Sequence, residues 1–187
     1  TVYTRYYDKS IHYKKNNNEK LIIGILGGID PIRKDYEIFY NNLLKLRDEI
    51  TIRFLGRFYK NFSENAIDCF KDYNIEYKKK LLSEEDFLRM GKDCDILLSL
   101  NKEEKYYGNY KGTGSFGDAM YLQKSLIIPA FADPIYEFSD FCYYYKDKKD
   151  LELIFHKIIN KEIKLEPKFE NFDIDICSKK IVDELNI

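Results

Sequence analysis

The sequence of 187 residues lacks several features that mark common functional classes. It has no tryptophan and only two histidines, and its four cysteines form no C-x-x-C pair, so neither a zinc site nor a disulfide framework is indicated. Lysine plus arginine number 31 against 32 for aspartate plus glutamate, which leaves no broad electrostatic field for nucleic acid. No apolar run approaches the roughly 20 residues that span a bilayer, and no signal peptide opens the chain. We therefore expect a cytoplasmic protein with no transmembrane segment, nucleic-acid partner, metal or cofactor.

The length of the chain suits one domain. The chain consists of three stretches of different composition. Residues 1–19 are polar without a clean period, and we expect a linker or an N-terminal extension there. Residues 20–163 alternate short apolar runs with helical periods, which is typical of βα units. Residues 164–187 form a tail in which SKKIVDELNI predicts a short helix, packed either on this domain or on another one.

The central stretch predicts an α/β fold that is Rossmann-like: a doubly wound, mostly parallel six-stranded sheet with helices on both faces. The expected strands are residues 21–26, 51–56, 75–79, 95–100, 126–131 and 142–145. The expected helices are residues 36–44, 64–73, 84–90, 116–123 and 151–161. Ser83 followed by Asp86 resembles a capping box for the third of these helices.

The turn LGGIDPIRKDYE is the first candidate site. It leaves the first strand through Gly27 and Gly28 and reaches a helix just after Arg33 and Lys34. Two glycines allow a close backbone approach to a ligand, and the helix start and the two cations favour an anion. The segment is compatible with phosphate or diphosphate binding, and equally with a plain tight turn flanked by solvated cations.

The second candidate site is the stretch KGTGSFGDAM, which opens a helix. Gly112, Thr113, Gly114 and Ser115 are small enough to make room for phosphate oxygens, and Asp118 can accept hydrogen bonds from ribose hydroxyls. Ser115 and Asp118 also fit a capping box, so both interpretations stay open.

The same stretch contains G-x-G-x-x-G at Gly112, Gly114 and Gly117, with Asp133 after the next expected strand, as in the dinucleotide fingerprint. The fingerprint needs its first glycine in a tight turn directly after a strand, whereas Gly112 lies well beyond Leu100. An NAD-type dinucleotide therefore remains a minor alternative.

Both candidate sites follow strands that are neighbours if the strand order is 3-2-1-4-5-6. Ligands of open α/β sheets bind at the carboxyl ends of the strands where this order reverses, between the first and the fourth strand. The two segments are then expected to share one crevice.

Three segments give the chain a family resemblance over residues 20–160: LGGIDPIRKDYEIFYNNL, LSEEDFLRMGKDCDILLSL and GTGSFGDAMYLQKSLIIPAF. The sequence resembles the C-terminal, nucleotide-sugar-binding domain of GT-B fold glycosyltransferases. The resemblance implies a UDP- or GDP-linked sugar as substrate and an acceptor domain on the N-terminal side. It also implies a location in the cytoplasm, or at the inner membrane surface for the full-length protein.

The resemblance assigns roles to individual residues. Lys34 corresponds to the basic contact of the diphosphate, with Arg33 as its neighbour, and Asp118 corresponds to the ribose ligand. Backbone and hydroxyl contacts come from the glycine-rich loops, and residues 80–82 lie near the base. The expected donor-binding residues are Gly27, Gly28, Arg33, Lys34, Gly112, Thr113, Gly114, Ser115 and Asp118.

Two positions depart from the family pattern. Many retaining members carry an arginine where Gly28 stands and a glutamate where Tyr110 stands, so the contacts of those residues are not carried over. His12 lies in the polar N-terminal stretch and His156 lies on an expected helix remote from both loops, and we assign no catalytic residue. The sequence thus predicts a glycosyltransferase donor domain, with a non-catalytic nucleotide-binding or structural module as the alternative.

Overall fold

The computed structural model describes Tyr7, Lys9, residues 20–103 and residues 113–185. Six strands form one sheet in the order β3-β2-β1-β4-β5-β6, with every pairing parallel. The strands are β1 Leu21–Leu26, β2 Ile50–Leu55, β3 Asn74–Glu76, β4 Ile96–Leu98, β5 Leu126–Pro129 and β6 Cys142–Tyr145. The predicted six-stranded α/β sheet is confirmed, and so is the order that brings β1 beside β4.

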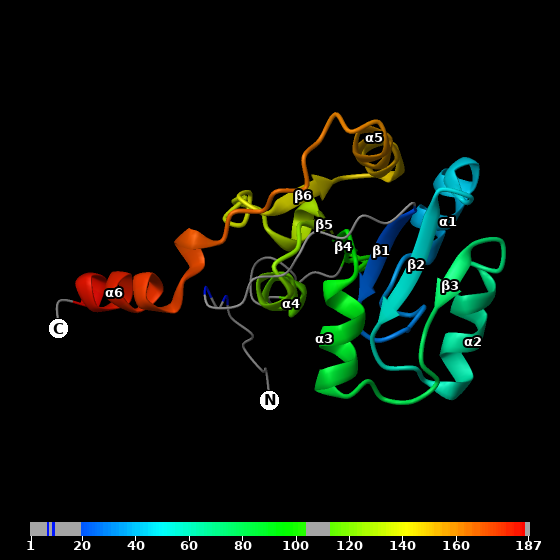
Figure 1. Cartoon of the computed structure of the whole chain (residues 1–187), viewed down its shortest axis with the longest axis horizontal. Helices are drawn as coiled ribbons and strands as arrows, with labels where there is room; N and C mark the ends of the chain where they lie inside the picture. The colour runs from blue at the N-terminus through cyan, green and yellow to red at the C-terminus, as the bar shows by residue number, and fades with distance from the viewer. Residues whose placement is uncertain (1–6, 8, 10–19, 104–112, 186–187) are drawn as a thin grey trace.

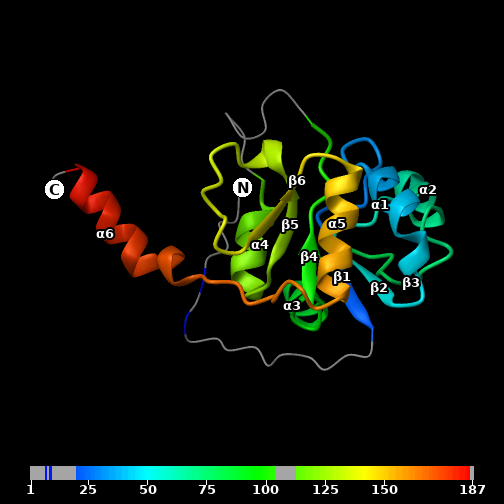
Figure 2. The same ribbon diagram turned by 90° about the horizontal axis from the view of Figure 1, so that it is seen from above.

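Helices cover both faces of this sheet (Figures 1 and 2). One face carries α1 Tyr36–Leu43, α2 Lys60–Asp68 and α5 Lys148–Ile159, whose apolar residues share one core cluster with alternate side chains of the strands. The other face carries α3 Glu84–Lys92 and α4 Ser115–Leu122. Ser83 caps α3 as expected, because its Oγ accepts a hydrogen bond from the Asp86 amide at 3.1 Å.

The second helix lies earlier in the sequence than predicted, at Lys60–Asp68 instead of residues 64–73. Beyond it, the amide of Phe70 donates to Ile67 and the amide of Tyr73 donates to Phe70, so consecutive turns replace the helix. Phe70 is nevertheless fully buried. Apolar residues three positions apart are compatible with a helix, but here consecutive turns bury Phe70 and Tyr73 instead.

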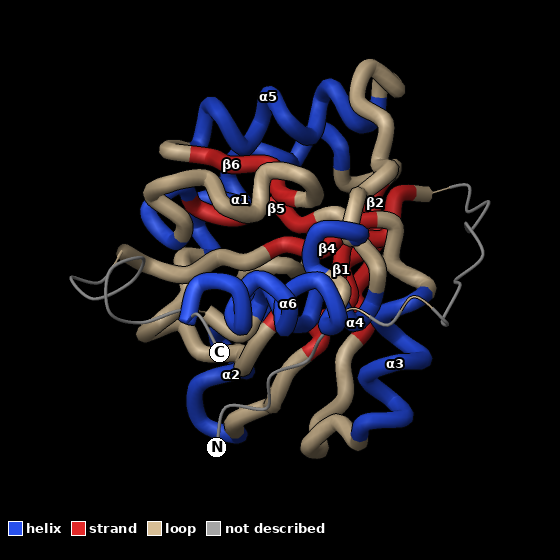
Figure 3. Tube along the Cα trace, turned by 90° about the vertical axis from the view of Figure 1, so that its left-hand side faces the viewer, coloured by secondary structure: helices blue, strands red, loops and turns tan. Residues whose placement is uncertain are grey.

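The tail contains α6 Ile174–Leu185, which begins before the predicted helix and stands away from the sheet (Figures 1 and 2). Figure 3 looks at the molecule from the side of α6, so that helix lies in front of the sheet. Phe169, just before α6, is buried and stacks on Tyr7 with ring centroids 5.5 Å apart. Lys9 lies 3.3 Å from the carboxylates of Asp173 and Asp175. The tail thus pairs with residues near the start of the chain. In the described part of the protein, no helix combines the length and the apolar character needed to cross a bilayer.

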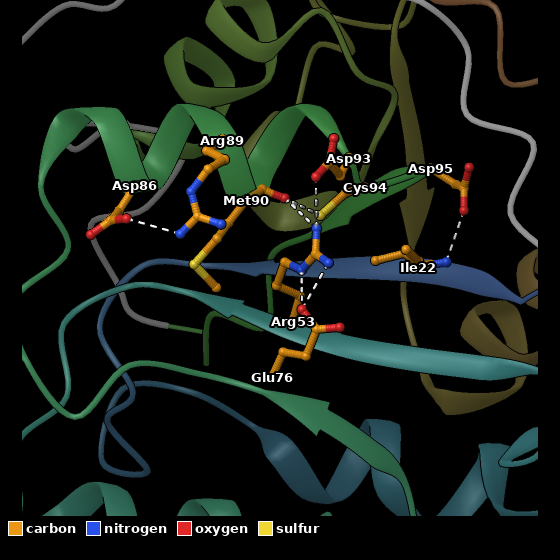
Figure 4. Close-up of polar contacts among 9 residues, drawn as sticks. All are labelled: Ile22, Arg53, Glu76, Asp86, Arg89, Met90, Asp93, Cys94 and Asp95. Atoms are coloured by element: carbon orange, nitrogen blue, oxygen red, sulfur yellow. Dashed lines mark hydrogen bonds and ion pairs between the residues drawn. The ribbon is translucent and has the colours of Figure 1, made fainter.

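Arg53 joins β2 to β3 and α3 (Figure 4). Its Nε and Nη2 lie 2.8 Å and 2.7 Å from Glu76 Oε2, and its Nη1 donates to the carbonyl of Met90 at 2.8 Å. The side chain of Arg53 is only 10% exposed, whereas that of Glu76 is 44% exposed. Solvent therefore screens the ion pair, and the buried hydrogen bonds and the packed aliphatic stem contribute most of the stabilisation.

We expect Arg53→Ala to lower the free energy of unfolding by about 2–3 kcal/mol, because it leaves the Met90 carbonyl without its donor and opens a void. Arg47→Ala is the matched control, since Arg47 is exposed and lies 3.9 Å from Asp48, and it should cost less than about 1 kcal/mol. Urea unfolding followed by circular dichroism measures both. Equal effects of the two substitutions would contradict this role of Arg53.

Candidate functional site

The loop between β1 and α1 leaves the sheet through Gly27, whose φ of +83° is a left-handed conformation that favours glycine. A Cβ on Gly27 would lie 3.2 Å from Nζ of Lys34. A Cβ on Gly56, at the end of β2, would lie 1.7 Å from the carbonyl oxygen of Gly27. The backbones after β1 and β2 thus approach so closely that no side chain fits between them.

Asp30 shapes the middle of this loop. Its Oδ1 accepts from the amide of Ile32 at 2.9 Å, and its Oδ2 accepts from Nε of Arg33 at 2.8 Å. Burial raises the pKa of the Asp30 carboxyl, but the bonds from Arg33 and Ile32 outweigh it and hold the pKa below its usual value. The ion pair orients Arg33, which is 53% exposed, at the edge of the site.

The end of the loop is bound to the segment that follows β4. Lys34 forms an antiparallel bridge with Asn101, and the amide of Asp35 donates to the carbonyl of Leu100 at 2.8 Å. Nζ of Lys34 donates to Oδ1 of Asn101 at 2.6 Å, and both side chains are buried. The strand order explains this contact, because β1 and β4 are neighbours in the sheet.

The ammonium group of Lys34 is a buried cation. Its desolvation, and then the nearby charge of Arg33, lower the pKa to about 8, whereas Asp118 and Asp30 act in the opposite direction. Lys34 therefore titrates just above neutral pH and remains mostly charged at pH 7. A buried cation of this kind is ready to accept an anion without a large loss of solvation.

The beginning of α4 forms the opposite wall. Gly114 occupies the N-cap position, so Ser115 is the first helical residue and does not cap the helix. Instead, Oγ of Ser115 donates to Oγ of Ser99 at 3.1 Å and accepts from Oγ1 of Thr113 at 3.1 Å. The capping-box interpretation of Ser115 and Asp118 is thus wrong, because the helix begins at Ser115, one residue earlier than that motif requires.

These walls enclose a cavity of about 180 Å³ at the carboxyl ends of β1 and β4. Every predicted donor-binding residue that the structure describes lines it, and Gly112 lies outside the described residues. Asn101 lines it as well and was missed in the sequence analysis. The lining residues are Gly27, Gly28, Arg33, Lys34, Asn101, Thr113, Gly114, Ser115 and Asp118.

A second cavity of about 180 Å³ adjoins the first, and Gly27 and Asp118 line both. Leu81 and Leu82, from the segment expected near the base, belong to its lining, as does Arg57. The remaining lining residues are Leu55, Gly56, Ser83, Glu84 and Phe87. The pair of cavities thus has a polar half with two cations and a more apolar half, with Asp118 between them.

The dinucleotide fingerprint does not have its required geometry. The strand β4 ends at Leu98, far before Gly114, and Gly117 lies inside α4. Asp133 is engaged in its own loop, where its carboxylate accepts from the amides of Glu137 and Phe138 at 3.0 Å each. In the described part of the chain, no three His, Cys, Asp or Glu side chains gather as metal ligands.

Comparisons with known proteins identify solved structures that share this fold. No family model and no curated protein matches the sequence. A glycosyl transferase group 1 C-terminal domain from Francisella tularensis superposes with a TM-score of 0.57 at 15% identity, covering 96% of this chain and 97% of that one. The UDP-forming α,α-trehalose-phosphate synthase from Burkholderia vietnamiensis gives 0.57 at 8% identity, covering 90% of this chain and 44% of that one. The N-terminal domain of trehalose-6-phosphate phosphatase from Candida albicans gives 0.53 at 13% identity, covering 91% and 39%.

The chain therefore has the fold of the C-terminal domain of GT-B glycosyltransferases. It spans nearly the whole Francisella domain but less than half of the Burkholderia synthase. At these identities the similarity establishes the fold, and the chemistry of the site has to be argued from its own residues.

Two glycine substitutions distinguish a steric requirement from open space at this site. Gly56→Ala should lower the free energy of unfolding by about 1–3 kcal/mol, because its Cβ collides with the Gly27 carbonyl. Gly114→Ala should cost less than about 1 kcal/mol, since no heavy atom from a more distant part of the described chain lies within 4 Å of its Cβ position. Thermal unfolding measures both, and a larger loss for Gly114→Ala would refute this description of the loops.

Proposed function

We propose that this chain is the donor-binding domain of a glycosyltransferase and holds the nucleoside-diphosphate part of a UDP- or GDP-linked sugar. The observation that supports this most is the convergence of two glycine-rich loops on one cavity at the switch point of the sheet. Lys34 is its buried cation and Asp118 its carboxylate.

The polar cavity suits the diphosphate. The ammonium of Lys34 and the guanidinium of Arg33 supply positive charge, and the N-terminal amides of α4 point their dipoles toward the same space. Gly114 lets phosphate oxygens approach the backbone, because the space around its Cβ position is open. Charge-assisted hydrogen bonds from such groups are about twice as strong as neutral ones.

Asp118 and the second cavity suit the nucleoside. Because Asp118 lines both cavities, its carboxylate can accept hydrogen bonds from ribose hydroxyls while the diphosphate occupies one side and the base the other. Leu82 and Phe87 offer an apolar surface for a planar base. The combined site therefore matches the order of diphosphate, ribose and base in a nucleotide sugar.

For transfer, this domain stabilises the nucleoside diphosphate as it leaves. Negative charge develops on the leaving diphosphate, and a cation that is already desolvated and held in place stabilises that charge without reorganising. The chain spans 44% of the Burkholderia synthase, so we propose that a second domain provides the acceptor. No residue of this chain is assigned as the catalytic base or nucleophile.

A non-catalytic nucleotide-binding module is the second candidate. Gly28 is favourable to it, because many retaining GT-B enzymes carry an arginine at this position. A Cβ on Gly28 would lie 2.8 Å from the ring of Tyr59, so an arginine fits here only if that ring moves. Nucleotide binding without sugar transfer, once an acceptor domain is supplied, would favour this candidate.

Calorimetric titration with UDP, GDP, ADP and NAD tests the proposal. We expect saturable binding of one nucleoside diphosphate and none of NAD. Lys34→Met should weaken that binding about 10- to 100-fold, which corresponds to the roughly 1.5–3 kcal/mol of a hydrogen bond to a charged group. Binding of the nucleoside alone should change little.

Lys124→Met is the matched control, because Lys124 is also a buried lysine whose pKa is lowered by burial. It lies just before β5, at the amino ends of the parallel strands, and does not line the cavity. Lys124→Met should leave nucleotide affinity unchanged. Asp118→Ala should weaken the binding of the nucleoside and of the nucleoside diphosphate alike, by about tenfold. Identical affinities of the wild type and both site variants would rule out this site.

A further inference from the structure

Asn101 gives the buried Lys34 ammonium its hydrogen-bond acceptor. The side chains of Lys34 and Asn101 belong to residues that are only 8% and 7% exposed, and Nζ lies 2.6 Å from Oδ1. The acceptor of the hydrogen bond from this ammonium is Oδ1 of Asn101. An ammonium group has three N–H donors, and a single amide oxygen engages one of them.

Asn101 is itself held in one orientation. Its Nδ2 donates to Oγ1 of Thr113 at 3.3 Å, and Thr113 is linked in turn to Ser115. Rotation of the amide by 180° would turn the NH₂ group toward the ammonium and leave Thr113 facing an oxygen. The hydroxyl network of the loop before α4 therefore points the amide oxygen at Lys34.

A neutral acceptor has a particular consequence at this position. Asp30 and Asp118 favour the charged form of Lys34, Arg33 and burial oppose it, and their balance brings the pKa to about 8. A carboxylate in place of the Asn101 amide would hold the ammonium equally well but would neutralise it. The amide holds the cation and leaves its charge for a ligand.

We propose that Asn101 is a positioning residue that fixes the Lys34 ammonium in the cavity without neutralising it, and thereby makes nucleoside-diphosphate affinity depend on pH. This inference rests on the proposed function. Asn101 acts through Lys34 and is not assigned a contact with the ligand.

The direction of the pH dependence follows from the charge of Lys34. Below pH 8 the free protein already carries the ammonium, and above it the amine is neutral. A bound diphosphate stabilises the ammonium and raises its pKa, so binding takes up a proton above pH 8. Since the terminal phosphate, with a pKa of about 6, is fully ionised there, affinity should fall toward a limit of about tenfold per pH unit.

Two variants of similar size separate positioning from simple support of the fold. Asn101→Asp should move the titration midpoint of Lys34 upward by about one unit or more, because a carboxylate favours the ammonium. Asn101→Leu should move it downward, because it removes the acceptor. Thr113→Val, which frees the amide to rotate, should move the Lys34 midpoint downward by less. This variant tests the same geometry if Asn101→Leu fails to fold.

The experiment combines two readouts on the full chain. Selective ¹³C labelling of lysine and NMR between pH 6.5 and 11 follow the Lys34 midpoint in the free protein. Calorimetry with UDP, GDP and ADP between pH 7 and 9, in two buffers of different ionisation enthalpy, measures affinity and proton uptake. Opposite shifts for Asn101→Asp and Asn101→Leu, with matching shifts in the pH dependence of binding, support the proposal.

The outcomes against the proposal are distinguishable from failure of the proposed function. Normal diphosphate binding with a Lys34 midpoint that stays near 10.5, or that moves the same way in both Asn101 variants, overturns the role of Asn101 alone. Absence of diphosphate binding in the wild type overturns the proposed function, and the pH-dependent binding with it, even where NMR shows the opposite shifts.

Discussion

A lysine side chain buried between two loops is the constraint on which the site depends. Lys34 comes from the loop after β1, and it is covered because the segment after β4 binds along that loop. This requires the strand order that makes β1 and β4 neighbours. Burial of the ammonium costs stability, and the packing of five helices on both faces of the sheet offsets that cost. The packed sheet thus provides the stability that allows the Lys34 ammonium to be buried in the crevice between β1 and β4.

The sequence predicted the sheet well because its central strands are short apolar runs separated by helices. The bounds of β1 and β6 were predicted to the residue. The edge strand β3 was predicted to reach residue 79, but it ends at Glu76, where its pairing with Arg53 of β2 is the last one. Apolar spacing reports burial, and burial in turns around Phe70 and Tyr73 imitates a helix. Periodicity alone does not separate these two cases.

The site was predictable where the type of a residue and its place in the sequence indicate its role. Glycines at a strand end and small residues at a helix start indicate anion binding through backbone geometry, and Lys34 and Asp118 carry obvious charges. The residue type of Asn101 predicts no particular role, because a neutral amide after a strand can take part in many kinds of contact. Its role depends on a partner 67 positions away in the sequence and on the orientation that Thr113 imposes. Such a role appears only when strand order brings the two segments together.

Low sequence identity to the solved GT-B structures is compatible with these constraints. At 8–15% identity, few side chains are shared. What a backbone of this kind demands is small residues at particular points, as at Gly27 and Gly56, and apolar side chains of any shape in the core. Charges in the cavity are a separate requirement, and several arrangements can meet it. Here the ammonium of Lys34 is buried, Asp30 and Asp118 favour its charge, and the acceptor of its hydrogen bond is the neutral amide of Asn101. That arrangement gives the ammonium a hydrogen-bond partner that carries no charge, whereas a carboxylate at position 101 would pair with it directly.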